Sequence, residues 1–215
     1  LTFFAPMPEP GKRMGPQALK MMDAFFKKYN IHKHYGKKIK QFNKKSIVFE
    51  DDTKLDSDFT MFIPAGDGHS VIKKSDLTTN NAGFIRTNDF SQVLFEKEGE
   101  VDSTMPTNIY AVGDIASLEG YDWRAKQGHV AEVMARNVAH NIMQRELGLN
   151  NFKGYHEHLN ILCVMDSGDG AAFVYRDEKR AFMLPMPFIG HWLKKGWGVY
   201  CRYSKLGRIP RIPGM

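Results

Sequence analysis

Cysteine is scarce in this chain of 215 residues and occurs only at Cys163 and Cys201. Two cysteines allow one bridge at most, so the chain is no disulfide framework, and a reducing compartment is the default expectation. Long apolar runs are also missing, because no stretch reaches the roughly 18 residues that a membrane-spanning helix needs. The chain opens at Leu1 on a strand-like segment, with neither a charged signal-peptide start nor an initiating methionine. We therefore expect a fragment or a processed chain.

Acidic residues are absent from residues 181–215, although the whole chain contains 24 Asp and Glu against 30 Lys and Arg. This segment carries six basic residues, which account for the net charge of +6: Lys194, Lys195, Arg202, Lys205, Arg208 and Arg211. A basic segment of this kind favours an anionic partner surface. Tryptophan and proline interleave with the cations, which fits a membrane better than a phosphate track, so no nucleic-acid partner is expected.

Hydrophobic patterning predicts an α/β protein. The first part reads as a strand at residues 1–5, a helix over 16–30, a second strand near 38–42 and a β-meander over 46–50 and 55–64. Short strands follow at 83–85 and 92–95, and then a helix over 124–147 with Gly148 as its stop. From residue 155 the period changes to two, which predicts strands at 159–164, 171–175 and 181–184. Residues 189–203 have apolar side chains at helical spacing.

One motif stands out at residues 104–115, TMPTNIYAVGDI, where an expected buried strand at 109–113 runs into a Gly-Asp pair. Gly113 has no Cβ, so a ligand could approach its backbone closely. Asp114 would sit at the carboxyl end of the strand, where ligands bind in open α/β sheets. An ordinary turn after a buried strand explains this motif equally well when it is taken alone.

Two segments that follow this motif in the sequence make its functional interpretation more specific. Ala125-Lys-Gln-Gly-His129 resembles the Lys-x-Gly helix start that follows the Gly-Asp motif in sulfide:quinone oxidoreductases, which are FAD flavoproteins with two dinucleotide-binding domains. Residues 162–171, LCVMDSGDGA, resemble the strand and turn that carry a redox cysteine in that family. A lone lysine is ordinarily a surface residue, and a lone cysteine on an apolar strand is ordinarily a small buried hydrophobe. Their positions after the Gly-Asp motif favour the functional interpretation of both.

The resemblance implies site residues and roles. Lys126 and the helix start would stabilise the negative charge of reduced flavin, and Cys163 would act as a redox thiolate. The residues implied in FAD binding are Gly113, Asp114, Ile115, Lys126, Gln127 and Gly128. Those implied at the quinone and the membrane are Phe188, Ile189, Trp192, Trp197, Tyr200 and Tyr203. No metal is expected, because the H-x-H pairs at 32–34 and 156–158 lack a surrounding ligand cluster.

The resemblance also implies an architecture, that of an incomplete tandem Rossmann-like flavoprotein. Residues 1–80 would belong to the second, NAD(P)-type domain and residues 81–150 to the C-terminal part of the FAD-binding domain. Residues 151–215 would form a C-terminal domain with strands and an amphipathic membrane-binding helix. The fingerprint G-x-G-x-x-G and a second redox cysteine are absent. Both are expected in an N-terminal half of the flavoprotein, which would be a partner, and this chain alone should bind FAD poorly.

The predicted function is FAD-dependent oxidation of sulfide or polysulfide with two electrons passed to quinone, by a monotopic, peripheral protein of the cytoplasmic membrane. A type II NADH:quinone dehydrogenase is an alternative that shares the fold but needs no cysteine at position 163. A soluble sulfide dehydrogenase that pairs with a cytochrome is another, which the basic tail disfavours. A flavin-free membrane-docking or assembly module is an alternative of a different class. The sequence is also compatible with a homo-oligomer.

Overall fold

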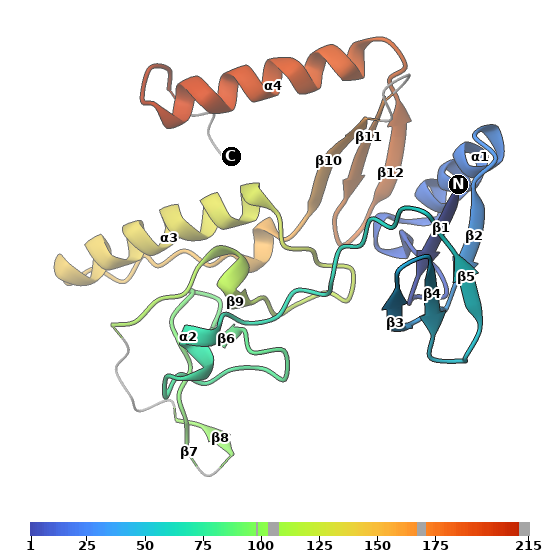
Figure 1. The fold of residues 1–215 in the computed structure, drawn as a ribbon. Helices are drawn as coiled ribbons and strands as arrows, with labels where there is room; N and C mark the ends of the chain where they lie inside the picture. Colours follow the sequence, from blue (N-terminus) through green and yellow to red (C-terminus); the bar gives the residue numbers. More distant parts are fainter. Residues whose placement is uncertain (98, 103–107, 167–170, 211–215) are drawn as a thin grey trace.

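The computed structural model of the protein describes residues 1–97, 99–102, 108–166 and 171–210. The fold is a mixture of helices and small sheets, which confirms the predicted α/β class. Three groups of elements follow one another along the chain (Figure 1). An N-terminal group with α1 stands beside a C-terminal three-stranded sheet, and a central group lies beneath α3. The tandem Rossmann-like arrangement and the domain boundaries stay predictions.

The N-terminal group is a strand–helix–strand unit followed by a meander. Its elements are β1 (Thr2–Ala5), the 3₁₀ turn η1 (Lys12–Met14), α1 (Pro16–Lys28), β2 (His32–Tyr35), β3 (Ile39–Asn43), β4 (Ser46–Phe49) and β5 (Lys54–Asp56). Strands β1 and β2 pair in parallel, and β3, β4 and β5 form an antiparallel sheet. Pro16 opens α1 at a position where its missing N–H costs nothing. Both the unit and the meander were predicted.

The second strand of this unit was predicted at the wrong place. Residues 39–42 belong to β3 of the meander, and the partner of β1 is β2, whose sequence His-Lys-His-Tyr was not predicted to be a strand. Because β2 is one of only two strands in its sheet, it needs little apolar burial, and its sequence shows no alternation. The predicted strand over 55–64 also ends early, at Asp56. Beyond it the Ser57 hydroxyl donates to the Phe59 carbonyl oxygen at 2.8 Å, a local bond that competes with strand pairing.

The central group packs short segments beneath a long helix. Its elements are α2 (Ser70–Lys73), β6 (Ile85–Arg86), β7 (Glu96–Lys97), β8 (Glu100–Val101), the 3₁₀ turn η2 (Gly113–Ile115), β9 (Ala116–Ser117) and α3 (Gly128–Glu146). Strands β6 and β9 pair in parallel. A cluster of buried apolar side chains joins these segments to α3: Ile85, Val93, Ala111, Ala116, Leu118, Val130, Met134, Tyr155 and Leu159. This cluster places the Gly-Asp turn against the start of α3.

Residues 109–113 do not form the predicted strand. Tyr110 makes an isolated antiparallel bridge with Gln92, and the chain then turns into η2. Among the described residues the backbone here pairs on one side only, where Val93 N–H donates to the Ile109 carbonyl and Ala111 N–H to the Ser91 carbonyl. With a single neighbouring segment no longer ladder forms. Residues 104–107 of the motif lie outside the described residues.

Helix α3 starts four residues later than predicted, at Gly128 instead of residue 124. Arg124 explains the delay, because its guanidinium donates to the carbonyl oxygens of Leu118, Gly120 and Tyr121 and so holds this segment as a loop. The predicted stop at Gly148 is confirmed. Its φ is +68°, and the N–H of the next residue, Leu149, donates to the Gln144 carbonyl at 2.8 Å, a glycine-based end of a helix.

The C-terminal group is an antiparallel sheet capped by a helix. Its elements are η3 (His156–His158), β10 (Ile161–Asp166), β11 (Ala171–Arg176), β12 (Ala181–Pro185) and α4 (Ile189–Lys205), in the sheet order β10-β11-β12. These elements confirm the three predicted strands and the helical segment. Residues 167–170 of the predicted turn lie outside the described residues. A Cβ added at Gly190 would lie 2.4 Å from the Ala171 Cβ, so only glycine allows the first turn of α4 to pack against the sheet.

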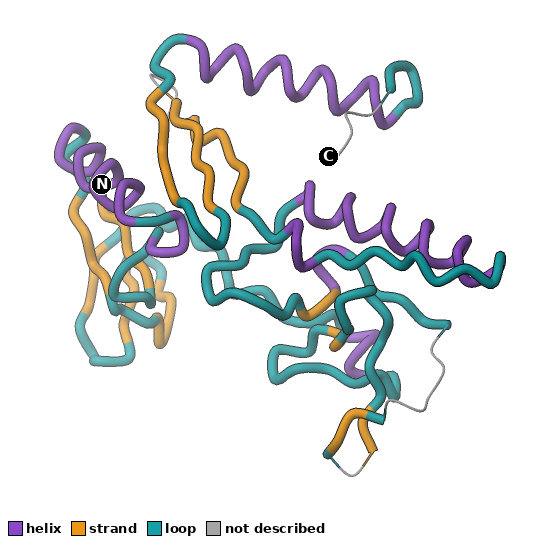
Figure 2. Tube along the Cα trace, turned by 180° about the vertical axis from the view of Figure 1, so that it is seen from behind, coloured by secondary structure: helices purple, strands orange, loops and turns teal. Residues whose placement is uncertain are grey.

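The far end of α4 extends over the central group. Figures 1 and 2 show the two helices α3 and α4 on the same side of the molecule, with α4 leading away from the C-terminal sheet. The Lys205 ammonium lies 3.3 Å from the Glu132 carboxylate of α3 and ties the two helices together. Helix α4 therefore contacts the sheet at one end and α3 at the other.

Candidate functional site

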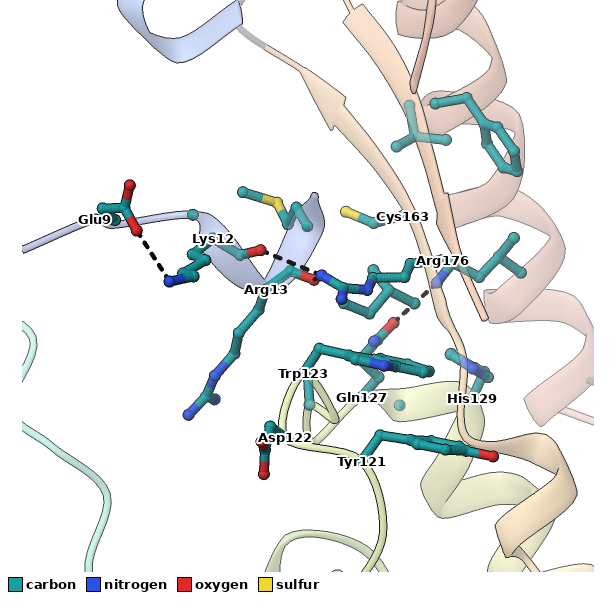
Figure 3. A pocket seen from close by; sticks show the side chains of 18 of the residues that line it. Glu9, Lys12, Arg13, Tyr121, Asp122, Trp123, Gln127, His129, Cys163 and Arg176 are labelled. Carbon is teal, nitrogen blue, oxygen red and sulfur yellow. Dashed lines mark hydrogen bonds and ion pairs between the residues drawn. The ribbon is translucent and has the colours of Figure 1, made fainter. Parts of the chain in front are cut away.

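A cavity of about 1510 Å³ lies where distant segments of the chain meet. Its walls come from residues 7–14, from residues 121–129 around the start of α3, and from β10, β11 and α4 (Figure 3). The volume exceeds the range of roughly 300–1,000 Å³ that is usual for sites of drug-sized ligands. The cavity is therefore the main candidate for a binding site in the part of the chain that the structure describes.

One arginine joins three walls of this cavity. Arg176 extends from the end of β11, and its Nη1 donates to the carbonyl oxygens of Lys12 at 3.2 Å and Arg13 at 2.8 Å. The same guanidinium lies 5.2 Å from the ring of Trp123, which stacks on Tyr121 with 5.0 Å between centroids and 4° between planes. Such cation–π and stacking contacts fix the loop before α3 against the sheet.

Polar side chains connect the start of α3 to β10. Gln127 Nε2 donates to the Asn160 carbonyl at 3.3 Å, and its Oε1 accepts from Leu162 N–H at 3.4 Å. His129 Nε2 lies 2.8 Å from Asn160 Oδ1. Burial lowers the pKa of His129 below its ordinary value, so its ring is neutral at pH 7. Because Gln127 is engaged in this way, it does not cap the helix, and in the part of the chain that the structure describes the first N–H groups of α3 keep their capacity to donate.

Cys163 lies on β10 and is half-buried, with its sulfur pointing toward η1 in Figure 3. It stands opposite Val174 of β11 in the sheet. Burial raises the pKa of its thiol, and the positive charge of Lys194 on α4 opposes this effect in part. The thiol thus needs a cation to be held in the ionised form that a nucleophile requires.

The Gly-Asp turn forms a second cluster with Lys126. Gly113 has a φ of +69°, and a Cβ there would lie 3.2 Å from the Ala131 Cβ of α3. The close packing of α3 therefore already favours glycine at this position, whether or not a ligand approaches its backbone. The Lys126 ammonium donates to the Asp114 carbonyl oxygen and lies 3.1 Å from the centroid of the Phe84 ring. Burial lowers the pKa of Lys126, and the Asp114 carboxylate partly opposes this shift.

The structure brings eight of the predicted site residues to these two places. Four of them line the cavity: Gln127, Gly128, Cys163 and Trp197. The others implied in FAD binding gather at the Gly-Asp turn and do not line the cavity: Gly113, Asp114, Ile115 and Lys126. The two clusters meet at residues 126–128, where α3 begins.

The sequence did not indicate several residues of the cavity. Arg176, Arg13, Met14 and His129 carried no signal of their own, because they reach the cavity only through the fold. The aromatic pair Tyr121 and Trp123 could have been noticed, since both follow the Gly-Asp motif within ten residues.

Five of the residues predicted at the quinone and the membrane do not line the cavity: Phe188, Ile189, Trp192, Tyr200 and Tyr203. Phe188 is 84% exposed and Trp192 is 70% exposed, and the Lys195 ammonium lies 5.0 Å from the Trp192 ring. The result is an amphipathic helix with an uncovered apolar side. Within the described residues no helix combines the length and the apolar character that a bilayer crossing demands.

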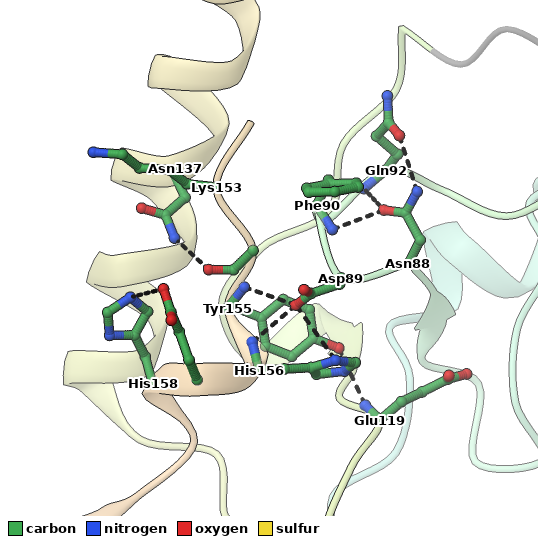
Figure 4. A network of polar contacts seen from close by, with 12 residues as sticks. Asn88, Asp89, Phe90, Gln92, Glu119, Asn137, Lys153, Tyr155, His156 and His158 are labelled. Carbon is green, nitrogen blue, oxygen red and sulfur yellow. Dashed lines mark hydrogen bonds and ion pairs between the residues drawn. The ribbon is translucent and has the colours of Figure 1, made fainter. Parts of the chain in front are cut away.

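A polar network anchors the segment that leads into β10 (Figure 4). One carboxylate oxygen of Asp89 accepts from the N–H groups of Tyr155 and His156, both at 2.8 Å. The Tyr155 hydroxyl accepts from Glu119 N–H at 3.2 Å, and Asn137 Nδ2 of α3 donates to the Gly154 carbonyl at 2.7 Å. These bonds fix the entry to β10, and therefore Cys163, relative to α3. Among the described residues no cluster of three or more His, Cys, Asp or Glu could hold a metal ion.

Comparison with known proteins finds likeness at the level of structure. No family model and no curated protein matches the sequence. The sulfide:quinone oxidoreductase of the hyperthermophilic bacterium Aquifex aeolicus matches 98% of this chain and 51% of its own, with a TM-score of 0.80 and 20% identity. Reduced CoADR-RHD of Bacillus anthracis matches 83% of this chain and 30% of its own, with a TM-score of 0.56 and 13% identity. Fdr9 matches 86% of this chain and 50% of its own, with a TM-score of 0.53 and 12% identity.

These likenesses show the fold. The predicted resemblance to a sulfide:quinone oxidoreductase is confirmed at that level, over nearly the whole chain. This chain spans about half the length of the Aquifex aeolicus enzyme.

Proposed function

We propose that this chain is part of a flavin-dependent oxidoreductase that oxidises sulfide or polysulfide and passes two electrons to a membrane quinone. The observation that carries the proposal is the fold, which matches a sulfide:quinone oxidoreductase at a TM-score of 0.80. The position of Cys163 supports it, because the thiol lies on a large cavity beside the start of α3. The whole enzyme would need the other half of that fold.

The residues at the Gly-Asp turn fit part of an FAD molecule. The Asp114 side chain is exposed, and within the described residues its carboxylate accepts no hydrogen bond, so it is available to the hydroxyl groups of a ribityl chain. Lys126 and the uncapped first N–H groups of α3 supply positive potential beside it. When bound, FAD would supply a two-electron acceptor. A glycine-rich cradle for its pyrophosphate is not in this chain, so we assign that cradle to the other half of the enzyme.

Cys163 is proposed as one of two sulfur-handling cysteines. Joining its thiolate to sulfide, HS⁻, as a persulfide, Cys–S–S⁻, would release one proton and two electrons, and bound FAD would be the acceptor of those electrons. Cys201 is not its partner in this scheme, because it lies on α4 and does not line the cavity. The second cysteine would come from the other half of the enzyme.

Helix α4 is proposed as the attachment to the membrane. Its exposed aromatic side chains suit the depth of lipid headgroups, and residues 181–215 contain basic residues without any acid. The quinone would reach the flavin from the lipid covered by this helix. Attachment in the plane of the membrane needs no helix long enough to cross it.

Sulfide bleaching of the flavin tests the proposal. The complete polypeptide encoded by the gene is loaded with FAD, and the flavin absorbance is followed after sulfide is added without oxygen. We expect sulfide to bleach the flavin, Cys163→Ala to abolish bleaching and Cys201→Ala to leave it intact. If NADH bleaches the flavin and the Cys163→Ala variant is indifferent, the protein is a type II NADH:quinone dehydrogenase. If the polypeptide takes up no FAD, it is a flavin-free module.

A further inference from the structure

Lys194 and Cys163 face the same cavity from two different elements, α4 and β10. The close approach of Gly190 to Ala171 fixes the first turn of α4 on the sheet, one helical turn before Lys194. Lys195, the next residue, lies over the Trp192 ring on the outside of the helix and does not line the cavity. Two adjacent lysines of α4 therefore differ in whether they face the thiol.

We propose that Lys194 is a positioning residue whose ammonium, on the same cavity, stabilises the thiolate form of Cys163 when this sulfur ionises. The inference deepens the proposed function and rests on it, because a thiol that captures sulfur must be ionised. It adds a residue of α4 to the sulfur site, although the residues of α4 were first considered only for lipid and quinone. Lys194 acts through Cys163 and is not itself assigned a bond to sulfur or flavin.

The other cations around the cavity are committed elsewhere. The guanidinium of Arg176 donates to two backbone carbonyls and stacks on Trp123. The Lys12 ammonium pairs with Glu9 at 3.1 Å, and the Arg13 guanidinium points away from Cys163 in Figure 3. Within the described residues Lys194 forms no ion pair or hydrogen bond. It is therefore the cation of the cavity that is available to a thiolate.

The remaining titratable groups near the thiol do not supply the positive charge that Lys194 supplies. His129 of α3 is neutral at pH 7, because burial lowers its pKa. On β10 itself, the Asp166 carboxylate lies 2.9 Å from Nδ1 of His191 on α4, so these two side chains are paired with each other. Asp122 points away from Cys163 in Figure 3. Among the described residues, Lys194 is the one whose charge lowers the pKa of the Cys163 thiol, against the larger effect of burial.

The test is the pH dependence of alkylation of Cys163 by iodoacetamide. The complete polypeptide carries Cys201→Ser in every variant, so that Cys163 is the cysteine of this chain that reacts, and mass spectrometry of its peptide gives the rate. Lys194→Gln should move the midpoint of the rate profile to higher pH and slow alkylation several-fold at pH 7.5, because removal of the cation disfavours the thiolate. At high pH the rate should equal that of the parent.

Two matched variants make the result specific. Lys194→Arg keeps the charge and should keep the parent profile, whereas Lys195→Gln removes a charge one residue away and should also keep it. Superimposable profiles for Lys194→Gln and the parent would overturn the proposal, as would an equal shift in Lys195→Gln. A Lys194→Arg profile that follows Lys194→Gln would assign the effect to packing instead of charge. The assay needs neither sulfide nor bleaching, so its failure is distinguishable from failure of the proposed function.

Discussion

Alanine at Gly113 should destabilise the protein more than alanine at Gly148, although the two glycines have nearly equal φ values of +69° and +68°. The left-handed conformation costs an L-residue roughly 1–2 kcal/mol at either position. Only at Gly113 does the added methyl group meet a neighbour, 3.2 Å away at the Ala131 Cβ, whereas nothing lies within 4 Å of it at Gly148. We assign this crowding about 1 kcal/mol, the lower end of the cost of overpacking. The free energy of unfolding should therefore fall by about 2–3 kcal/mol in Gly113→Ala and by about 1–2 kcal/mol in Gly148→Ala.

A double variant identifies the contact. Ala131→Gly removes the methyl group that crowds position 113, at a cost of about 1 kcal/mol for glycine inside a helix. Gly113→Ala combined with Ala131→Gly should then lose about 1 kcal/mol less than the sum of the two single losses. Urea unfolding followed by circular dichroism measures all four proteins. The reasoning is refuted if Gly113→Ala costs no more than Gly148→Ala, or if the two losses simply add. That outcome would leave the left-handed conformation as the structural reason for glycine at this position.

Three further changes test other parts of the structure. Asp89→Ala should lower the free energy of unfolding by about 1–3 kcal/mol, because the His156 N–H loses its acceptor and the Tyr155 N–H keeps only the backbone carbonyl of residue 89; an unchanged urea midpoint would contradict the anchoring role. The pKa of Asp51 is lowered from 3.8 to about 2, chiefly by the hydrogen bond from Lys37. The stability that this carboxylate contributes is therefore present above about pH 4 and is lost as pH falls toward 2. Asp51→Asn should flatten the pH dependence of unfolding in that window, and an equally steep loss would exclude this carboxylate as a source. Trp192→Ala should weaken binding to anionic liposomes about tenfold, since burial of such a side chain is worth roughly 1.5–3 kcal/mol. Phe59→Ala, which removes another exposed aromatic side chain outside α4, should not; equal losses would argue against attachment through α4.

The C-terminal group was predictable because its signals are local. Period-two alternation identified β10, β11 and β12, and apolar spacings of three and four identified α4. Strand β2 was missed because a two-stranded sheet buries little of it, and its sequence lacks the alternation on which the prediction depends. The end of α3 was correct at Gly148, whereas its start was wrong, because Arg124 holds the preceding loop through carbonyls that no local pattern reveals.

The cavity could not be predicted from the sequence, because its walls come from opposite ends of the chain. The hydrogen bond from Arg176 to the Lys12 carbonyl joins residues 164 positions apart. A second such contact lies nearby, where Met183 N–H donates to Gln17 Oε1 at 2.8 Å. A basic residue at the end of a strand gives no indication that its partners are backbone carbonyls near the N-terminus. Motif spacing therefore found Cys163 and Gln127 but not the arginine that closes the cavity around them.

Three consecutive residues at the start of α3 explain how one element can serve both clusters. The Lys126 side chain turns toward the Gly-Asp turn, and the Gln127 side chain turns toward β10. Gly128 has no side chain, and a Cβ there would meet open space, so the backbone itself faces the cavity. A ligand held at Asp114 and a thiol on β10 are thus both placed by the same rigid backbone. Helix α4 adds a cation to the same cavity, because Lys194 lines it together with Cys163.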